Sequence, residues 1–475
     1  MSQLPAFDLQ RLLQEHDNSI ELLEGYINPA LARVLRIIGF DVRYVRGQGA
    51  YLYDDRGNRY IDCLGGYAVF NVGRNHPVVR EALKQAMDLD LPNLVKMGTA
   101  RLSGILAKQL VELSPGDLDT VFFTNSGAEG VETAIKYARA ATGRARVLHC
   151  QKGFHGLTLG ALAINGNAEF REGFGPMMEH TTAVPFNDLA ALERELSRND
   201  VAGFIVEPIQ GKGVNVPDDH YLPQAAELCR KHGALFIADE VQTGYGRTGR
   251  MFACEHWNVE PDILITAKGL SGGYVPVGAV LAKRWIYHKV FSNLDRCVVH
   301  STTFGQNDLA MAAGLATLHV LRHERLVENA AAMGQRLMAR LSALIGKYEM
   351  VRQVRGKGLM IALEFGPPRS MGLKMGWSLL HKLDASLFPQ AILIPLLTEH
   401  RILAQVAGHH LDVIKLIPPL VLSEQDVDAI GDAFEQVVAA CHRFPGPAWE
   451  VGKRLSQQAI RSRSGRGQVP AATSS

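Results

Sequence analysis

Between about residues 120 and 282 the chain repeats one hydrophobic pattern, in which a short apolar run is followed by a longer segment of helical character. The six runs are TVFFT (120–124), RVLHC (146–150), AGFIVEP (202–208), ALFIADE (234–240), DILIT (262–266) and VGAVLA (277–282). Short apolar runs that alternate with helices are typical of βαβ units around a mostly parallel sheet. Such sheets bind ligands beyond the carboxyl ends of their strands, so the residues that follow each run are candidates for function.

The pattern changes on both sides of this region and predicts further units. Residues 303–348 form a long helical stretch, after which VRQVRGKGLMIALEFGPP (351–368) indicates a second, smaller α+β unit. The DRGN sequence at 55–58 predicts a turn between two strands near the N-terminus. We therefore divide the chain into four parts: an N-terminal segment (1–75), a large domain (76–335), a C-terminal small domain (336–445) and a disordered basic tail (446–475). The N-terminal segment is expected to contribute to the small domain and to dimer contacts.

Composition narrows the class of protein. The chain has 475 residues, of which 47% are hydrophobic, enough for a large core and two or three structural units. Its 50 basic and 48 acidic residues nearly cancel, and no basic stripe is interleaved with aromatics, so nucleic acid is not an expected partner. The N-terminus has no secretion signal, and no run of about 18 apolar residues predicts a membrane-spanning helix.

The cysteines point to a reducing compartment. The six cysteines are scattered along the chain without CxxC pairs. This distribution argues against a zinc site and against a disulfide framework, and we expect no metal site. Reduced thiols and the absence of a targeting signal predict a cytoplasmic protein.

Two strand ends carry ionisable residues that a core would not normally accept. Asp239 and Glu240 follow the apolar run ALFIA, and Lys268 follows DILITA. Burial disfavours the charged form of either group, so each needs a partner, and a desolvated lysine is a nucleophile toward aldehydes. The structural alternatives are a helix cap or an ion pair of the acid with a nearby arginine such as Arg247, and a helix-end cap for Lys268.

Two further segments have features of a phosphate and ring-binding site. TNSGAEGVETAIKYARAATG (124–143) places Ser126, Gly127 and Ala128 at the start of a helix, where free N–H groups bind phosphate; an ordinary helix cap is the alternative. KGFHGLTLGAL (152–162) adds Phe154 and His155 in a glycine-flanked turn, where an aromatic face could stack on a planar ligand or belong to the core. A phosphate cradle, a stacking ring, an acid and a lysine together form the apparatus that pyridoxal phosphate requires.

The chain resembles the class III (ω-) aminotransferases of the fold type I pyridoxal-phosphate enzymes. The resemblance spans about residues 51–422 and rests on NSGAEGVETAIKYAR, FHGLTLGAL, EPIQG, DEVQTGYGRTG, AKGLSGG and HSTTFGQN, in the family's order. IDCLGGYAVFNVGRNHP and RMFACEHWNVEPDIL are most similar to the putrescine branch of the putrescine and ornithine-type enzymes. The resemblance implies an α/β fold, with a mostly parallel seven-stranded sheet flanked by helices in the large domain and a smaller α+β domain built from the N- and C-terminal segments.

The resemblance also implies roles for individual residues. Lys268 would form the Schiff base with pyridoxal phosphate and act as the base, while Asp239 would pair with the pyridinium nitrogen. The other predicted cofactor contacts are Ser126, Gly127, Ala128, Phe154, His155, Glu207, Val241, Gln242 and Thr303. Thr303 would reach the phosphate in the neighbouring subunit, which implies a homodimer with active sites at the interface. Tyr67 is a candidate wall of the substrate site.

The sequence departs from the family at two substrate positions. Where related enzymes have the glutamate of EPIQGE and the arginine of an IRxxPPL segment, this chain has Lys212 in EPIQGKG and Lys415 in IKLIPPL. In the family the arginine binds the oxo-acid carboxylate, and the glutamate pairs with the arginine when an amine binds. A lysine offers only a point charge. We expect an amine or aldehyde substrate with an apolar or extended chain, and an oxo acid held by these lysines or another cation.

The predicted function is therefore ping-pong transfer of an amino group from a primary amine or ω-amino donor (a diamine, alkylamine or ornithine-like compound) to a 2-oxo acid or aldehyde. A pyridoxal-phosphate decarboxylase or racemase on the same fold is the alternative within the class, because fold alone does not decide the reaction. A non-catalytic nucleotide-binding protein is the alternative outside it, although the chain lacks a strand–GxGxxG–helix fingerprint. The sequence does not identify the amine.

Overall fold

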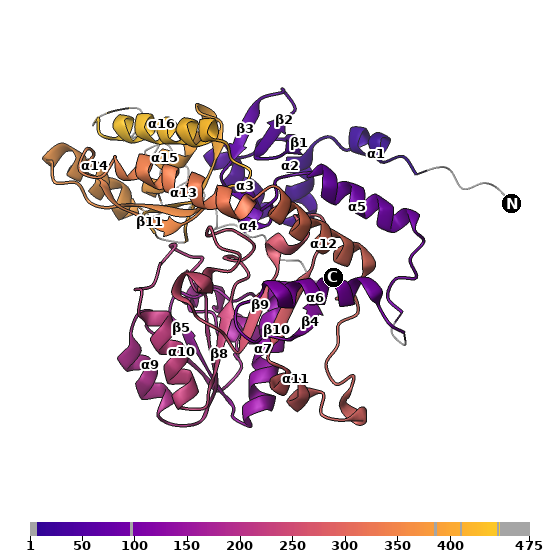
Figure 1. Ribbon diagram of the computed structural model, residues 1–475. Coiled ribbons are helices and arrows are strands. Elements are labelled where there is room, and N and C mark those ends of the chain that lie inside the picture. The colour runs from indigo at the N-terminus through magenta and orange to yellow at the C-terminus, as the bar shows by residue number, and fades with distance from the viewer. Residues whose placement is uncertain (1–6, 96–97, 384–386, 409–410, 444–445, 447–475) are drawn as a thin grey trace, which may run out of the picture.

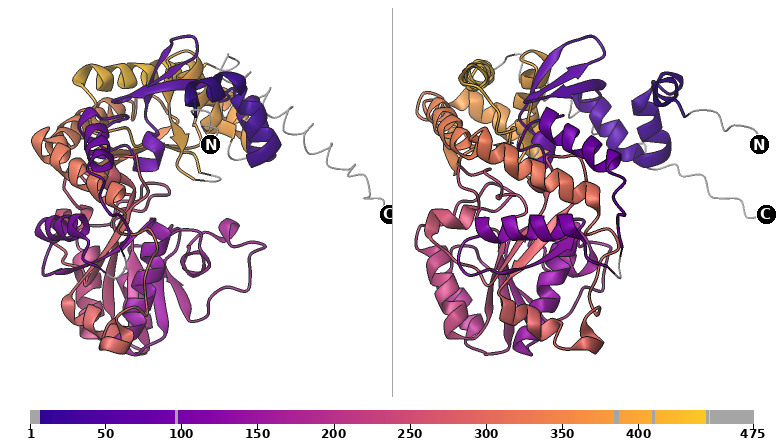
Figure 2. Two further views of the ribbon diagram at one scale, coloured as in Figure 1. Left: turned by 90° about the vertical axis from the view of Figure 1, so that its right-hand side faces the viewer. Right: turned by 45° about the vertical axis from the view of Figure 1, so that its right-hand side comes forward.

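The computed structural model describes residues 7–95, 98–383, 387–408, 411–443 and 446. The basic tail predicted for residues 446–475 lies outside the described residues except for Gly446. Figure 1 shows the largest sheet and its helices in the lower part of the molecule, and two smaller sheets with the C-terminal helices in the upper part. Helix α12 (Asp308–His323) runs between the two parts (Figures 1 and 2).

The largest sheet has seven strands in the order β4-β10-β9-β8-β7-β5-β6. In that order the strands are Thr120–Thr124, Gly278–Ala282, Ile263–Thr266, Leu235–Asp239, Val201–Val206, Arg146–Cys150 and Thr181–Val184. Strands β5 to β9 pair in parallel, whereas β10 is antiparallel to both of its neighbours. All six predicted runs are strands, and the fold class predicted for the large domain is confirmed. The seventh strand, β6, was not predicted, because its sequence TTAV contains no long apolar run.

Both faces of this sheet are covered by helices, which explains why its central strands are apolar throughout. Helices α7 (Gly127–Thr142) and α11 (Arg284–Val290) bury one face in a cluster with strand residues such as Ile205 and Ile237. The other face is buried in a larger hydrophobic cluster, which contains the alternate strand residues Phe204 and Phe236. Four helices contribute to this cluster: α6 (Arg101–Leu113), α9 (Leu189–Leu196), α10 (Tyr221–Lys231) and α12. Successive strand residues thus point to opposite faces.

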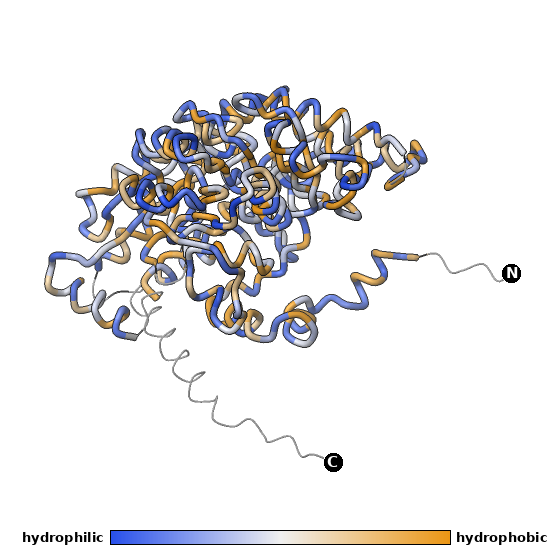
Figure 3. Tube along the Cα trace, turned by 90° about the horizontal axis from the view of Figure 1, so that it is seen from below, coloured by the Kyte–Doolittle hydropathy of each residue, from blue (hydrophilic) through white to orange (hydrophobic). Residues whose placement is uncertain are grey.

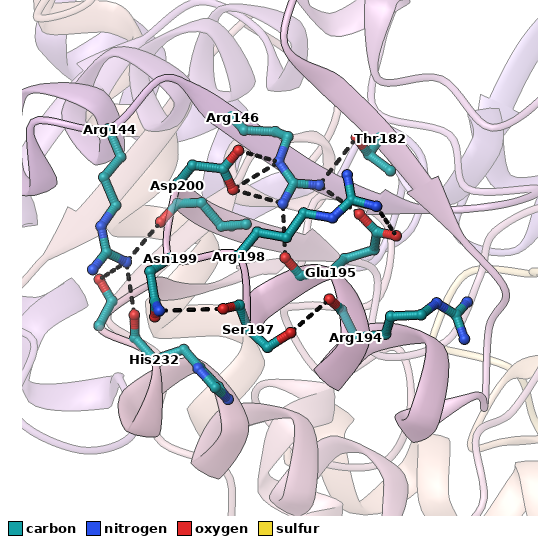
Figure 4. Close-up of polar contacts among 12 residues, drawn as sticks. Arg144, Arg146, Thr182, Arg194, Glu195, Ser197, Arg198, Asn199, Asp200 and His232 are labelled. Carbon is teal, nitrogen blue, oxygen red and sulfur yellow. Dashed lines mark hydrogen bonds and ion pairs between the residues drawn. The ribbon is translucent and has the colours of Figure 1, made fainter.

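The amino ends of the central strands are closed by an ionic cluster (Figure 4). Arg146, at the start of β5, contacts Asp200 at 2.6 Å and Glu195 at 2.7 Å, and Arg144 donates 2.7 Å and 3.0 Å hydrogen bonds to the carbonyls of His232 and Gly233. Arg146 is only 7% exposed, so its two acidic partners compensate for the loss of water. This end of the sheet is therefore occupied by structural contacts, and the opposite end remains available for a ligand.

Two four-stranded sheets lie in the upper part. The first has the order β1-β2-β3-β13 (Tyr44–Gln48, Tyr51–Asp54, Arg59–Asp62, Ile402–Leu403), and the second β11-β12-β15-β14 (Val351–Lys357, Met360–Phe365, Val413–Leu416, Gln405–Val406). The predicted DRGN turn joins β2 to β3, which pair antiparallel. Because β13 pairs in parallel with β3, the C-terminal part of the chain is tied to the N-terminal segment. The proposed domain boundaries stay predictions.

The remaining helices surround these sheets. The predicted helical stretch 303–348 is divided into α12 and α13 (Leu326–Ser342), because Arg325 has a left-handed backbone with φ of 52° that ends the first helix. Outside the N-terminal arm, the other α-helices of the described residues are α4 (Gly65–Ala68), α5 (Pro77–Asp88), α8 (Leu159–Ala163), α14 (Met371–Leu383), α15 (Leu387–Thr398) and α16 (Glu424–Cys441). The single-turn elements are η2 (Ala168–Phe170), η3 (Ala253–Trp257), η4 (Lys268–Ser271) and η5 (Leu294–Arg296).

Residues 7–38 form an N-terminal arm. It consists of α1 (Leu9–Glu15), α2 (Ser19–Leu22), the π-helical turn η1 (Leu23–Ile27) and α3 (Pro29–Ile38). Seen from below, the beginning of this arm extends away from the body of the protein and carries hydrophobic as well as polar residues (Figure 3). Among the residues that the structure describes, none of the helices combines the length and apolar character needed to cross a membrane.

Candidate active site

A cavity of about 1140 Å³ lies at the carboxyl ends of the central strands. Its walls contain thirteen of the fourteen residues that the sequence singles out: Tyr67, Ser126, Gly127, Ala128, Phe154, His155, Glu207, Lys212, Asp239, Val241, Gln242, Lys268 and Lys415. The edge of the sheet brings these residues together, as expected for a ligand site in an α/β fold.

Asp239 is the last residue of β8 and is held from two sides. One carboxylate oxygen accepts a 3.1 Å hydrogen bond from the Val241 N–H, and the other lies 2.7 Å from Nδ1 of His155. Both side chains are buried, each residue being 3% exposed. The alternative of an ion pair between this acid and Arg247 is wrong, because Arg247 donates to the carbonyls of Leu359 and Pro418 and to the side chain of Asn71.

The neighbouring Glu240, in contrast, has structural contacts. Its carboxylate is fully buried, accepts a hydrogen bond from the Cys254 N–H at 2.8 Å and pairs with the Thr243 hydroxyl. Burial raises the pKa of Glu240. Of the two acids after this strand, only Asp239 lines the cavity.

Glu207 and His155 extend the polar layer behind Asp239. Glu207 follows β7 and accepts hydrogen bonds from the N–H groups of Phe154 and Gly211, both at 2.8 Å. Burial raises the pKa of Glu207. Burial alone would lower the pKa of His155, but its hydrogen bond to Asp239 and the charges of Asp239 and Glu207 raise it. The contact with Asp239 therefore stabilises the protonated form of His155.

Lys268 begins the turn η4, immediately after β9, with a left-handed φ of 39°. Its ammonium group forms no hydrogen bond or ion pair with the described residues, so the helix-cap alternative has no supporting contact in that part of the chain. Desolvation lowers the pKa of Lys268, although Asp239 and Glu207 oppose this shift. A lysine with a lowered pKa, facing a cavity, is suited to attack an aldehyde.

The start of α7 provides the predicted cradle. Ser126 is the N-cap, and its hydroxyl accepts a hydrogen bond from the Glu129 N–H at 3.2 Å. A Cβ atom on Gly127 would lie 2.7 Å from a methyl group of Val241, so glycine is required for the helix to start this close to β8. The N–H groups of Gly127 and Ala128 make no hydrogen bond to the described residues and remain free for an anion.

These residues fit pyridoxal phosphate. Asp239 can pair with a ring nitrogen, Lys268 can bond an aldehyde carbon, and the start of α7 can hold a phosphate. Phe154 and Val241 line the same cavity and can cover the two faces of a ring. Within the described residues, no cluster of three or more His, Cys, Asp or Glu side chains could hold a metal ion.

Lys212 and Lys415, the two lysines that replace the family's glutamate and arginine, have different surroundings. Lys212 forms a 2.6 Å ion pair with Glu169 and lies 4.1 Å above the ring of Phe170. Lys415, on β15, is 5% exposed and donates to the Gly211 carbonyl at 2.9 Å and to Gln242 Oε1 at 3.4 Å. As expected from the two lysines, the family's Glu/Arg pairing is absent between positions 212 and 415, and the counterion of Lys212 is Glu169 from another segment.

Two glutamines of the cavity wall were missed by the sequence analysis. Gln390 on α15 and Gln405 on β14 both line the cavity. Gln390 Oε1 and Gln405 Nε2 are buried and have no hydrogen-bond partner among the described residues. Neither stands in a recognisable motif, and only the fold of the C-terminal part brings them to the cofactor end of the large sheet.

Thr303 is the one predicted site residue that lies elsewhere in this chain. It lines a separate cavity of about 380 Å³, together with residues of the start of α7 and of the 300–304 loop. Its predicted role therefore concerns a second subunit and stays a prediction, as do the individual roles of the other site residues.

The fold and the arrangement of the cavity are those of a fold type I transaminase. The chain matches the family model described as aminotransferase class III over residues 38–438. It belongs to the class III aminotransferase family, and its cofactor is pyridoxal phosphate.

Among characterised relatives, the chain is 41% identical over 373 residues to the putrescine aminotransferase of Pectobacterium atrosepticum, covering 75% of this chain and 78% of that protein. It is 32% identical over 453 residues to the aminotransferase PigE of a Serratia species, covering 89% of this chain. The chain spans 53% of the length of PigE, about half of that relative.

Solved structures give the same assignment. An ornithine aminotransferase from Toxoplasma gondii, with pyridoxal phosphate partially occupying its active site, has a TM-score of 0.78 at 30% identity, covering 92% of this chain and 98% of that one. An acetylornithine aminotransferase from Elizabethkingia anophelis has a TM-score of 0.68 at 34% identity, covering 84% and 94%. The predicted family, fold type, enzyme class and cofactor are confirmed, and the comparisons give no support for the decarboxylase or racemase alternative.

Proposed function

We propose that this protein transfers an amino group from a primary amine with an extended, largely apolar chain to a 2-oxo acid, in two half-reactions at one site. One observation carries this proposal. A single cavity contains Lys268, which has no counterion among the described residues, the buried Asp239–His155 pair and a wall of apolar side chains. Pyridoxal phosphate, when bound, accepts the amino group and stabilises the negative charge left on the donor carbon.

The protein's own groups divide the remaining work. Lys268 Nζ would hold the cofactor covalently, and in its free, unprotonated form it would take the proton from the donor carbon. A positioned base of this kind contributes about 10²–10⁴-fold to the rate. Asp239 keeps a proton on the ring nitrogen by its negative charge, and His155 fixes the orientation of Asp239 through the 2.7 Å contact.

The cofactor is positioned by groups that take no part in proton transfer. The start of α7 would hold the phosphate through the N–H groups of Gly127 and Ala128. Phe154 and Val241 would exclude water from the two ring faces, and the Gln242 side chain would lie near the ring hydroxyl oxygen. These contacts hold the reacting carbon near Lys268.

The lining of the cavity supports an amine with an uncharged chain. Its apolar wall consists of Val34, Val69, Tyr274, Val275, Pro276, Val277, Val406 and Ala407. The carboxylates that line it are Asp239 and Glu207, and both are engaged by other residues of the site. A second ammonium group, as in a diamine or ornithine, would meet Lys415 and, among the described lining residues, no free carboxylate. It should therefore bind less well.

A donor panel tests this proposal. The holoenzyme is mixed with butylamine, hexylamine, octylamine, putrescine, ornithine or β-alanine without an oxo acid, and conversion of the cofactor to its aminated form is followed by absorption. We expect stoichiometric conversion with the alkylamines, with kcat/KM rising along the series because each buried CH₂ contributes up to about 0.8 kcal/mol. Oxo acid should then restore the original absorption.

The same panel contains the outcomes that contradict the proposal. Release of carbon dioxide or inversion of a chiral donor without net amination would indicate a decarboxylase or racemase. A preference of about tenfold or more for putrescine over hexylamine would show that the site recognises a charge at the far end of the donor amine. That result would reject the proposal of an apolar donor.

We further propose a homodimer with active sites at the interface. Large apolar side chains remain exposed on the N-terminal arm and beside the loop of Thr303, among them Tyr26 at 86%, Ile27 at 76%, Leu294 at 89% and Val298 at 73%. Exposed apolar surface of this extent is typical of an interaction surface, and a second copy of the chain is the partner we propose. The cytoplasmic location stays a prediction.

Complementation between two inactive subunits tests the shared site. Lys268→Ala removes the lysine of its own cavity, and Thr303→Asp places a negative charge where the partner's cofactor phosphate would lie. Each homodimer should be inactive, whereas co-expressed chains should regain partial activity, because one site of a mixed dimer has both an intact Lys268 and an intact Thr303. A monomer in sedimentation, or no recovery in purified mixed dimers, would contradict the shared site.

A further inference from the structure

Lys415 is a buried cation without a counterion. Its Nζ contacts only neutral oxygens, those of Gly211 and Gln242, and no carboxylate of the described residues lies within ion-pair distance. Burying an unpaired ammonium group is costly, so such a residue either loses its proton or waits for an anion. Because Lys415 lines the same cavity as Lys268, the anion would be part of a substrate.

Gln405 places a second unsatisfied donor beside Lys415. The two residues are directly paired across the antiparallel strands β14 and β15. Opposed side chains on an antiparallel pair point to the same face, with Cβ atoms about 4.5–5.5 Å apart. The Nε2 group of Gln405 is buried and has no partner within the described part of the chain. An ammonium and an amide donor on one face, both short of acceptors, together suit a carboxylate.

We propose that Lys415 and Gln405 bind a carboxylate of the acceptor oxo acid, and that Lys415 takes up a proton from solvent when this carboxylate enters and releases it when the carboxylate leaves. This inference rests on the proposed transamination and adds the means by which one cavity accepts two unlike substrates. The neutral lysine accommodates an apolar amine, and the protonated lysine pairs with the acid.

The charged groups around Lys415 support both protonation states. Burial lowers the pKa of Lys415 to about 7, and the positive charge of Lys268 on η4 adds to the shift. Glu207, after β7, opposes it, while Lys212 in the following turn and Arg247 lower the pKa further. An incoming carboxylate raises this pKa, so protonation and binding support each other.

A lysine can work in this way and an arginine cannot. A guanidinium stays charged at any physiological pH, so it needs a second residue to neutralise it when an amine binds. Lys212 cannot be that residue, since it is itself a cation and is paired with Glu169 at 2.6 Å. In this chain a proton replaces the movable acidic side chain.

Calorimetry with the holoenzyme tests the proposal. Glutarate, a dicarboxylate without an oxo group, is titrated at a pH about one unit above the pKa of Lys415, in buffers with different enthalpies of ionisation. We expect close to one proton taken up per bound glutarate, and an affinity that falls about tenfold for each further pH unit. Gln405→Leu should lower the affinity for glutarate by about tenfold without changing the number of protons taken up per bound glutarate.

Substitutions at Lys415 identify the group that takes up the proton. Lys415→Arg should bind glutarate without that proton, and any uptake that remains belongs to Lys268 and the cofactor. Lys415→Met should lose at least about tenfold in affinity and its pH dependence. Lys357→Met, on β11 of the same sheet and outside the cavity, is the matched control and should behave as the wild type.

Three outcomes would overturn the inference: pH-independent glutarate affinity in the wild type, no proton uptake, or the same uptake in Lys415→Met. The amine half-reaction is measured on the same samples. If it is intact while proton uptake is absent, only this inference fails. If amines do not convert the cofactor in the wild type, the proposed function fails.

Discussion

Replacement of Lys268 by alanine should slow the amine half-reaction by about 10²–10⁴-fold, the usual contribution of a positioned base. The variant loses both the covalent attachment of the cofactor and the base at the donor carbon. It should still bind pyridoxal phosphate through α7 and Asp239, but without the absorption of the lysine adduct. Single-turnover absorption with hexylamine measures the loss.

Two comparisons make this result specific. Lys231→Ala removes an exposed lysine of α10 and should have wild-type rates, because the ion pair of Lys231 with Glu193 lies on the surface, away from the cavity. Added methylamine should restore part of the activity of Lys268→Ala if the missing group is a base. A Lys268→Ala enzyme within about tenfold of the wild type would exclude Lys268 as the base.

Asp239→Asn should slow the amine half-reaction by about 10²–10³-fold, the usual loss when one charge that stabilises a transition state is removed. Asparagine has nearly the same shape and can still accept the 3.1 Å hydrogen bond from the Val241 N–H. It cannot keep the ring nitrogen protonated, because it has no charge. The rate should be lost while the fold and the cofactor are retained.

Asp262→Asn is the matched control for this variant. Asp262 accepts a hydrogen bond from the Phe236 N–H at 2.9 Å and pairs with Lys283 at 3.1 Å, outside the cavity. We expect some loss of thermal stability and wild-type turnover. An equal loss of turnover in both variants would attribute the effect of Asp239→Asn to folding.

Much of this fold follows from hydrophobic patterning, because a sheet covered on both faces requires runs that are apolar throughout. Strands β7, β8 and β9 meet this condition at nearly every position. The rule that ligands bind beyond parallel strand ends then locates Asp239 and Lys268. The edge strand β6 does not show this hydrophobic pattern, because only Val184 of its four residues is buried. Its sequence is too short and too polar to predict a strand.

The substrate end of the site could not be predicted in the same way. Gln405 belongs to a strand of two residues, whose position depends on pairing with β15. The partner of Lys212, Glu169, lies 43 residues earlier, in a short 3₁₀ turn with no apolar pattern. Local sequence carries little information about such contacts, since each depends on where distant segments meet.

Arg247 is a second example of a contact that local sequence does not predict. Its position shortly after Asp239 suggested an ion pair, yet its guanidinium is completely buried among carbonyl groups and Asn71. The arginine joins the C-terminal part of the chain to the segment before α5, and leaves Asp239 to His155. Proximity in the sequence thus suggested Arg247 as the partner of Asp239, whereas the fold brings His155 to it.

Mass spectrometry of the borohydride-reduced holoenzyme tests the central claim most directly. The cavity contains two lysines with lowered pKa values, Lys268 and Lys415, and either could in principle react with an aldehyde. Reduction makes the covalent bond permanent, and digestion then locates it. The account predicts one cofactor per chain on the peptide that contains Lys268. Cofactor on Lys415, or no covalent cofactor at all, would contradict it.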